Sequence, residues 1–183
     1  MNAHGDLLKT YIENRSIISI KREKIDNNTI LSTPLKVSTD FLLLAYLYDF
    51  FLNGYKIVKI EDITQLKQSD SEKHIEEICN KERILEFRQN FDSLSLTNWQ
   101  SIFRWISYTD QIVTIESEKL NGSEFYIGSI IVVESDSLAI LQFDGAGIWD
   151  KDRSIIKYDS ISCITFGDMY SSLMGKYAKA ESH

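Results

Sequence analysis

The stretch "FYIGSIIVVESDSLAILQFD" at residues 125–144 holds two apolar runs separated by a short acidic turn, with one glycine in the first run. Residues 30–49, "ILSTPLKVSTDFLLLAYLYD", follow the same plan. Short apolar runs bounded by polar turn residues are typical of buried strands. The chain therefore contains the same strand–turn–strand design twice.

The segments on either side of this design repeat as well. Residues 16–20 match residues 111–115 at an offset of 95, and residues 57–66 match residues 155–164 at an offset of 98. The strand–turn–strand stretch itself repeats at an offset of 96. Because the pieces keep their order and small insertions in turns explain the changing offset, the pattern indicates one duplicated unit.

Each unit begins with a helical pattern and continues as strands. Apolar residues three and four positions apart predict a helix near residues 7–12 and another near residues 99–106. Five short strands follow each helix, and polar turns are expected at 24–29 and 119–124. A bent sheet that closes on itself would remove most exposed strand edges in so small a unit. We therefore expect a mainly β protein with short helices, of the α+β class.

The length of 183 residues accommodates two such units and a connection between them. We expect a first barrel over residues 1–70, a helical linker over 71–95, and a second barrel over 96–183 that ends in a helix or tail. Ser69 or Ser71 can cap the start of the linker helix, because both precede an interrupted stripe of apolar residues.

The second strands of the two units differ where they are expected to bend. Gly128 lies within this strand in the second unit, and glycine commonly permits a sharp bend. The first unit has Ser32 at the matching position and Pro34 two residues later. Because proline confines a strand to an edge or a bulge, we expect the first unit to bend differently.

Several of these features together resemble the Sm-like fold, a small SH3-like barrel. They are the leading helix, the five bent strands, Gly128, the pattern V-x-x-D-x-L-x-I at 133–140, and "IIKYDSISCI" at 155–164. The resemblance covers most of each half and implies two tandem five-stranded barrels. It also implies ring formation through the fourth and fifth strands, so we expect either a pseudo-dimer within the chain or a homo-oligomer.

The resemblance further implies RNA binding, but the residues of the family's RNA pocket are replaced here. In that family an asparagine follows the acidic turn, and an Arg-Gly pair lies in the later strand. The corresponding residues in this chain are Leu138 or Ala139 and Lys157-Tyr158 in the second unit, and Leu42 or Leu43 and Lys59-Ile60 in the first. We therefore expect the fold without this pocket, and RNA binding through a divergent site is kept as the alternative.

The net charge is −7 and the sequence pI is about 5.0. Residues 91–183 carry a net charge of −6 and residues 1–90 only −1. Such a surface repels phosphate backbones and anionic membranes and attracts basic partners, so nucleic-acid binding is not favoured. The longest apolar run is too short to cross a bilayer, and no apolar signal-peptide core follows the first residues, so we expect a cytoplasmic protein.

Residues with catalytic or metal-binding potential do not form a recognisable set. Cys79 and Cys163 are widely separated and are expected to be free thiols in a reducing compartment. The three histidines, His4, His74 and His183, lack metal-ligand spacing to cysteines or carboxylates. The recurring Asp40 and Asp136 are expected to be turn residues that bond nearby backbone N–H groups, because aspartate commonly does so. We therefore expect no enzyme, no cofactor and no metal.

The remaining candidates are aromatic residues beside acidic ones, because such groups can anchor a basic protein. The candidate partner-binding residues are Trp149, Asp144, Asp150 and Asp152 in one loop, and Phe166, Asp168 and Tyr170 after the last strand. Packing in the core or between the units is the alternative role for the aromatic ones. The sequence thus predicts a non-catalytic protein-interaction module, such as an acidic inhibitor or an immunity protein for a nuclease toxin.

Overall fold

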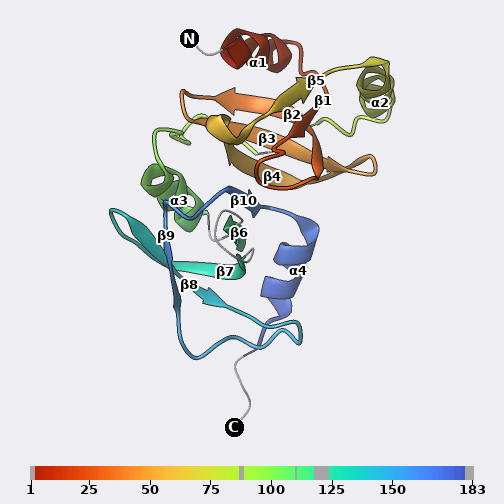
Figure 1. The fold of residues 1–183 in the computed structure, drawn as a ribbon. Helices are drawn as coiled ribbons and strands as arrows, with labels where there is room; N and C mark the ends of the chain where they lie inside the picture. The colour runs from red at the N-terminus through yellow and green to blue at the C-terminus, as the bar shows by residue number, and fades with distance from the viewer. Residues whose placement is uncertain (1–2, 87–88, 110, 118–123, 180–183) are drawn as a thin grey trace.

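The computed structural model describes residues 3–86, 89–109, 111–117 and 124–179, and strands dominate it (Figure 1). The first half contains α1 (Ala3–Glu13), β1 (Ile18–Lys21), β2 (Thr29–Val37), β3 (Phe41–Tyr48), β4 (Phe51–Lys59), the short 3-10 helix η1 (Ile60–Asp62) and β5 (Gln65–Lys67). Helix α2 (Asp70–Lys81) follows and starts one residue before the expected linker. The second half contains α3 (Trp99–Tyr108), β6 (Val113–Ser117), β7 (Glu124–Val133), β8 (Ser137–Gln142), β9 (Ser154–Lys157), β10 (Cys163–Phe166) and α4 (Met169–Tyr177).

All ten described strands belong to one antiparallel sheet in the order β5-β1-β2-β3-β4-β10-β6-β7-β8-β9. The expected mainly β, α+β class is therefore confirmed. Two separate closed barrels are not confirmed, because β4 of the first half pairs with β10 of the second and the described sheet is open at β5 and β9. The expected turn at 119–124 lies almost entirely outside the described residues.

The strand register repeats at the offsets found in the sequence. The pair Ser32↔Tyr46 in β2–β3 corresponds to Gly128↔Gln142 in β7–β8, and both partners are displaced by 96 residues. Strands β1 and β6 correspond at an offset of 95, and β4 and β9 at 98. In each half the fifth strand lies beside the first. The internal repeat is thus present in the backbone pairing.

Pro34 lies beside a bulge in β2, which is one of the places where a strand tolerates proline. The irregularity between Pro34 and Lys36 in β2 recurs between Ile130 and Val132 in β7, at the same place in the repeat. A bulge accommodates a proline because one residue leaves the ladder there. Both sequences therefore adopt the same irregularity.

One hydrophobic core spans both halves. Its buried side chains come from β3 and β4 of the first half, from α3, β6, β8, β9 and β10 of the second, and from the segments before α3 and β10. Phe41, Leu43 and Ile57 pack in the same cluster as Phe103, Ile115 and Ile164. A second cluster under α1 contains Leu8, Ile20 and Leu44 together with Cys163 from β10. The two halves are therefore not packed independently.

Two further observations concern the chain as a whole. Cys79 and Cys163 are both buried and neither forms a disulfide, as the sequence predicted. Within the described ranges, no helix combines the length and apolar character that a bilayer-spanning segment requires.

Candidate functional site at the junction of the halves

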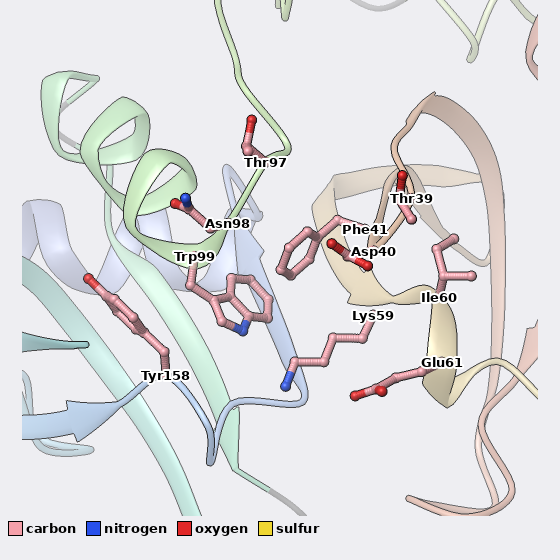
Figure 2. Close-up of a pocket in the computed structure, with 10 residues that line it drawn as sticks. All are labelled: Thr39, Asp40, Phe41, Lys59, Ile60, Glu61, Thr97, Asn98, Trp99 and Tyr158. Atoms are coloured by element: carbon pink, nitrogen blue, oxygen red, sulfur yellow. The ribbon is translucent and has the colours of Figure 1, made fainter. Parts of the chain in front are cut away.

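A pocket of about 530 Å³ lies where the two halves meet. Residues 39–41 and 59–61 line it from the first half, and residues 97–99 and Tyr158 line it from the second (Figure 2). We call this the junction pocket. Its walls come from a turn before β3, the start of η1, the start of α3 and the end of β9, so it depends on how the halves pack.

The turn before β3 is set by a serine and leaves an aspartate exposed. The Ser38 hydroxyl accepts hydrogen bonds from the backbone N–H groups of Asp40 (3.3 Å) and Phe41 (3.0 Å). The Ile60 N–H donates to the Asp40 carbonyl at 2.8 Å, which fixes η1 against the turn. The expectation that the Asp40 carboxylate would bond these backbone groups is therefore wrong. Its side chain is exposed at the pocket instead.

The wall contributed by the second half is positioned by a lysine and by the N-cap of α3. The ammonium of Lys36 on β2 donates to the carbonyls of Phe91 (3.1 Å) and Leu94 (2.8 Å), which ties the segment before α3 to the first half. Asn98 then caps α3, because its side chain accepts from the Ser101 N–H at 2.8 Å. These contacts place Trp99, the first residue of α3, in the pocket wall.

Aromatic rings form the floor of the junction pocket. Phe41 and Trp99 meet edge to face with ring centroids 4.7 Å apart, across the boundary between the halves. The ring centroids of Trp99 and Phe103 are 5.7 Å apart, and Phe103 stacks on Tyr158 with a centroid distance of 5.8 Å. Phe41 and Trp99 are only 5% exposed. The pocket therefore offers rigid apolar surface.

Carboxylates outnumber cations around this apolar floor. Asp40 and Glu61 lie at the rim and are exposed, whereas Lys59 is half-buried. The pKa of Tyr158 is raised to about 12, mainly by burial, with Arg104 opposing the rise and the carboxylates of Asp136 and Glu134 adding to it. Among the residues that line the pocket, two carboxylates thus accompany one ammonium group. Such a rim favours a cationic ligand.

One polar atom of the pocket wall has no partner. The indole Nε1 of Trp99 is inaccessible to water and has no hydrogen-bond partner among the described residues. Figure 2 shows this nitrogen on the edge of the ring that faces the end of Lys59. By contrast, the Nε1 of Trp105 donates to the Ser93 hydroxyl at 2.9 Å. A buried donor without an acceptor is uncommon in folded proteins.

The pocket has binding features but no reactive set. Its side chains supply carboxylates, hydroxyls, an amide and an ammonium, and the described residues that line it include neither a cysteine nor a histidine. In the part of the chain that the structure describes, no three His, Cys, Asp or Glu residues gather as a metal site would require. The arrangement can hold an apolar group beside a positive charge.

Four of the seven sequence-predicted residues come together elsewhere. Trp149, Asp144, Asp150 and Asp152 line a shallow pocket of about 540 Å³ in the loop between β8 and β9. The Asp144 carboxylate accepts from the backbone N–H groups of Ala146 and Ile148 at 2.9 Å each, which shapes this loop. Trp149 is half-buried and packs edge to face on Phe143 at 5.2 Å.

Basic residues offset part of the negative charge in that loop. Lys151 and Arg153 line the same shallow pocket as the three aspartates. Charge alone therefore does not distinguish this loop from the junction pocket, where two carboxylates accompany one lysine. The junction pocket differs in its floor of buried aromatic rings.

The other three predicted residues have different surroundings. Phe166 is 0% exposed and packs in the shared core. Asp168 is buried and caps α4, because its carboxylate accepts from the Ser171 N–H at 2.8 Å. Tyr170 is exposed in the first turn of α4. The structure therefore gives two of these three residues a position in the interior.

The residues of the junction pocket were not predicted as a site. Asp40 was interpreted as a turn residue, and Trp99 as part of the apolar stripe of a helix. The pocket is built from four segments that lie apart in the chain, so it leaves no local motif. One signal was present: the turn "STD" contains a serine that can take over the hydrogen bonds of the turn and leave the aspartate unused.

Comparisons with protein-family models, with curated proteins and with solved structures found no match for this chain.

Proposed function

We propose that the chain is a non-catalytic interaction module that binds a basic protein partner at the junction pocket. The observation that carries this proposal is an apolar, aromatic-floored pocket whose rim bears the carboxylates of Asp40 and Glu61. Binding energy at protein interfaces concentrates where a side chain fills a desolvated pocket, and complementary charge at the rim selects the partner. An acidic inhibitor of a nuclease-type protein is the role that fits these features.

As part of the same proposal, the two halves are divergent Sm-like units packed as a pseudo-dimer in a cytoplasmic protein. Support comes from the repeated strand register, from the fifth strand lying beside the first in each half, and from the leading helices α1 and α3. Two buried cysteines that form no disulfide agree with a reducing compartment.

RNA binding is the second candidate, and the same pocket favours it in one respect. Aromatic rings beside a lysine can stack a base and neutralise a phosphate, and Trp99, Tyr158 and Lys59 offer these groups. The carboxylates of Asp40 and Glu61 oppose it, because they repel a phosphate backbone.

The experiment uses the full chain with Trp105→Phe and Trp149→Phe, so that fluorescence reports Trp99 alone. The probes are lysine-flanked dodecapeptides whose central residue is leucine or phenylalanine, a matched peptide with central glycine, and one whose lysines are replaced by glutamates. We expect saturable binding of the apolar-centred basic peptides, weakening with salt, at least tenfold weaker binding of the glycine peptide, and no binding of the acidic one.

Equal binding of the acidic and basic peptides, or the absence of saturable binding by the basic ones, would overturn the proposal. Decauridylate at low salt is the nucleic-acid arm. Its salt-sensitive binding at Trp99, without peptide binding, would support the RNA candidate instead. Asp40→Asn and Glu61→Gln should each weaken the basic peptides about two- to fivefold, as expected for rim charges.

A further inference from the structure

Trp99 combines two properties that are rarely found together. Its ring is 5% exposed and contacts Phe41 and Phe103, so the packing of both halves fixes its position. Its Nε1–H is nevertheless buried without an acceptor in the described structure. A buried indole N–H normally finds a partner, and leaving one unpaired is destabilising.

Another indole nitrogen in the same helix does have a hydrogen-bond acceptor. Trp105, six residues later in α3, donates to the hydroxyl of Ser93. Of these two indole nitrogens in α3, the unpaired one therefore belongs to the residue that lines the junction pocket. Unpaired buried groups that survive at a pocket are candidates for groups whose partner is the ligand.

The remaining polar groups of the pocket define that partner. Lys59 is a second donor on the side to which Nε1 turns, and Asp40 and Glu61 are acceptors across the pocket (Figure 2). A ligand that matches both needs an acceptor of its own together with a positive charge. A peptide segment with a basic side chain carries both, because each residue contributes a backbone carbonyl.

We infer that the junction pocket binds an extended peptide segment of its partner, with one backbone carbonyl accepting a hydrogen bond from Trp99 Nε1 and an apolar side chain on the aromatic floor. This inference rests on the proposed function, which it deepens by naming the group that the indole binds. Nε1 is inaccessible to water in the free protein, so a lining side chain moves on binding. Lys59, half-buried and flexible, is the side chain we expect to move.

The first measurement needs no change to the pocket. The indole N–H resonances of the ¹⁵N-labelled chain are assigned with Trp99→Phe, Trp105→Phe and Trp149→Phe, and the wild-type chain is titrated with the lysine-flanked, leucine-centred dodecapeptide. We expect the Trp99 proton resonance to move downfield on saturation, because its hydrogen bond forms in the complex. The Trp105 resonance should stay in place, because Ser93 already accepts from its N–H. Saturable binding without movement of the Trp99 resonance would overturn the inference and leave the proposed function intact.

The second measurement is a cycle between protein and peptide. In the protein, Trp99→Phe removes the donor and keeps an aromatic ring. In the peptide, each of the three peptide bonds around the leucine is replaced in turn by an E-alkene isostere, which removes that bond's carbonyl and N–H. We expect about a tenfold loss of affinity from Trp99→Phe and a similar loss from one isostere. The two losses should not add, since both remove the same bond.

Trp105→Phe is the matched control and should leave the affinity unchanged. A Trp99→Phe chain that binds as tightly as wild type, or losses that multiply for all three isosteres, would overturn the inference. If Trp99→Phe prevents folding, the isostere scan on the wild-type chain and the Trp99 indole resonance still test the inference. No loss of affinity from any isostere, together with an unchanged Trp99 resonance, would overturn it. Absence of any saturable peptide binding by the wild-type chain would overturn the proposed function as well.

Discussion

At Gly128 the backbone of β8 leaves no room for a side chain. A Cβ placed there would lie 2.0 Å from the carbonyl oxygen of Leu141, and its nearest neighbours are backbone atoms that cannot rotate away. The glycine in the quoted stretch is thus required by the close approach of two strands. Sequence reasoning had assigned it to a bend, which is a different use of the same residue.

Gly128→Ala should therefore destabilise the fold by about 3 kcal/mol, through strain between β7 and β8. Urea unfolding followed by far-UV circular dichroism measures this loss. Gly145→Ala is the matched control, because a Cβ there meets no atom within 4 Å, and its effect should stay within about 0.5 kcal/mol. Equal effects of the two substitutions would show that the contact at Leu141 relaxes without cost.

Glu72 links the linker helix to the first half. Its carboxylate accepts from the Ser19 hydroxyl on β1 at 2.7 Å and from the Ser69 N–H at 2.6 Å, where it completes a capping box. Burial pushes the pKa of Glu72 upward, but these hydrogen bonds outweigh it and lower the pKa to about 2 from its ordinary 4.5. The carboxylate therefore stabilises the folded state above pH 4.5, and this contribution is lost as the pH falls towards 2.

Glu72→Gln should lower the free energy of unfolding at pH 7 by about 1–2 kcal/mol, because it weakens the cap and the bond to Ser19. Its stability should also fall less than that of wild type between pH 4.5 and pH 2. Urea titrations at a series of pH values measure both effects. Glu77→Gln, at an exposed position of the same helix, is the control. Parallel pH profiles of wild type and Glu72→Gln would contradict the assignment.

At the scale of elements, helix α4 shows which structural features can be predicted from the sequence and which cannot. Its start was predicted as a surface motif, yet Asp168 is turned inward to cap the helix and Phe166 lies in the core. The succession of strands along the chain and the offsets of the repeat could be predicted from the sequence, because both follow from local patterns of apolar and turn residues. The pairing of β4 with β10 was not readable, since no local pattern says which edge meets which.

The candidate site illustrates the same limit. Each contributing segment was recognised as a turn, a strand end or a helix start, but the pocket exists only because the β4–β10 pairing brings residues 39–41 and 59–61 to Trp99. The unpaired Nε1 cannot be inferred from sequence at all, because it depends on every neighbour of the indole. The acidic residues of the loop at Trp149 were readable, but Lys151 and Arg153 offset part of their charge.

Asp168→Ala tests the role of this residue in its helix. Removing the cap from α4 should destabilise the protein by about 1 kcal/mol, because the Ser171 N–H loses its acceptor. Thermal unfolding measures this. Tyr170→Ala, at the exposed position two residues later, should change stability by less than about 0.5 kcal/mol. If Asp168→Ala were neutral for stability and instead weakened peptide binding, Asp168 would belong to the partner surface that the sequence predicted.

At the scale of the whole molecule, the halves are joined by paired strands, a shared core and an ionic cluster. Glu116 on β6 lies 3.2 Å from the ammonium of Lys56 on β4 and 3.7 Å from the guanidinium of Arg22. Arg22 is itself only 3% exposed and pairs with Asp26 at 2.6 Å. Burial alone would lower the pKa of Lys56, but surrounding negative groups, Glu116 among them, raise it overall. Charges buried in this way are costly to separate, so the joint resists opening.

A shared core makes the two halves one cooperative unit, and the tryptophans allow this to be measured. All three, Trp99, Trp105 and Trp149, lie in the second half, so their fluorescence follows that half, whereas far-UV circular dichroism follows the whole chain. Leu43 is fully buried in the shared core and lies on β3 of the first half. We expect Leu43→Ala to remove about 2–5 kcal/mol of stability and to shift both signals together in urea, because a cavity in one half weakens the packing of the other.

Tyr48→Ala, at an exposed position of the same strand, controls for the loss of a large side chain and should shift neither signal appreciably. A fluorescence transition that keeps its wild-type midpoint while the dichroism becomes biphasic would show two halves that unfold separately, and a pocket lying between them would then open without unfolding the chain.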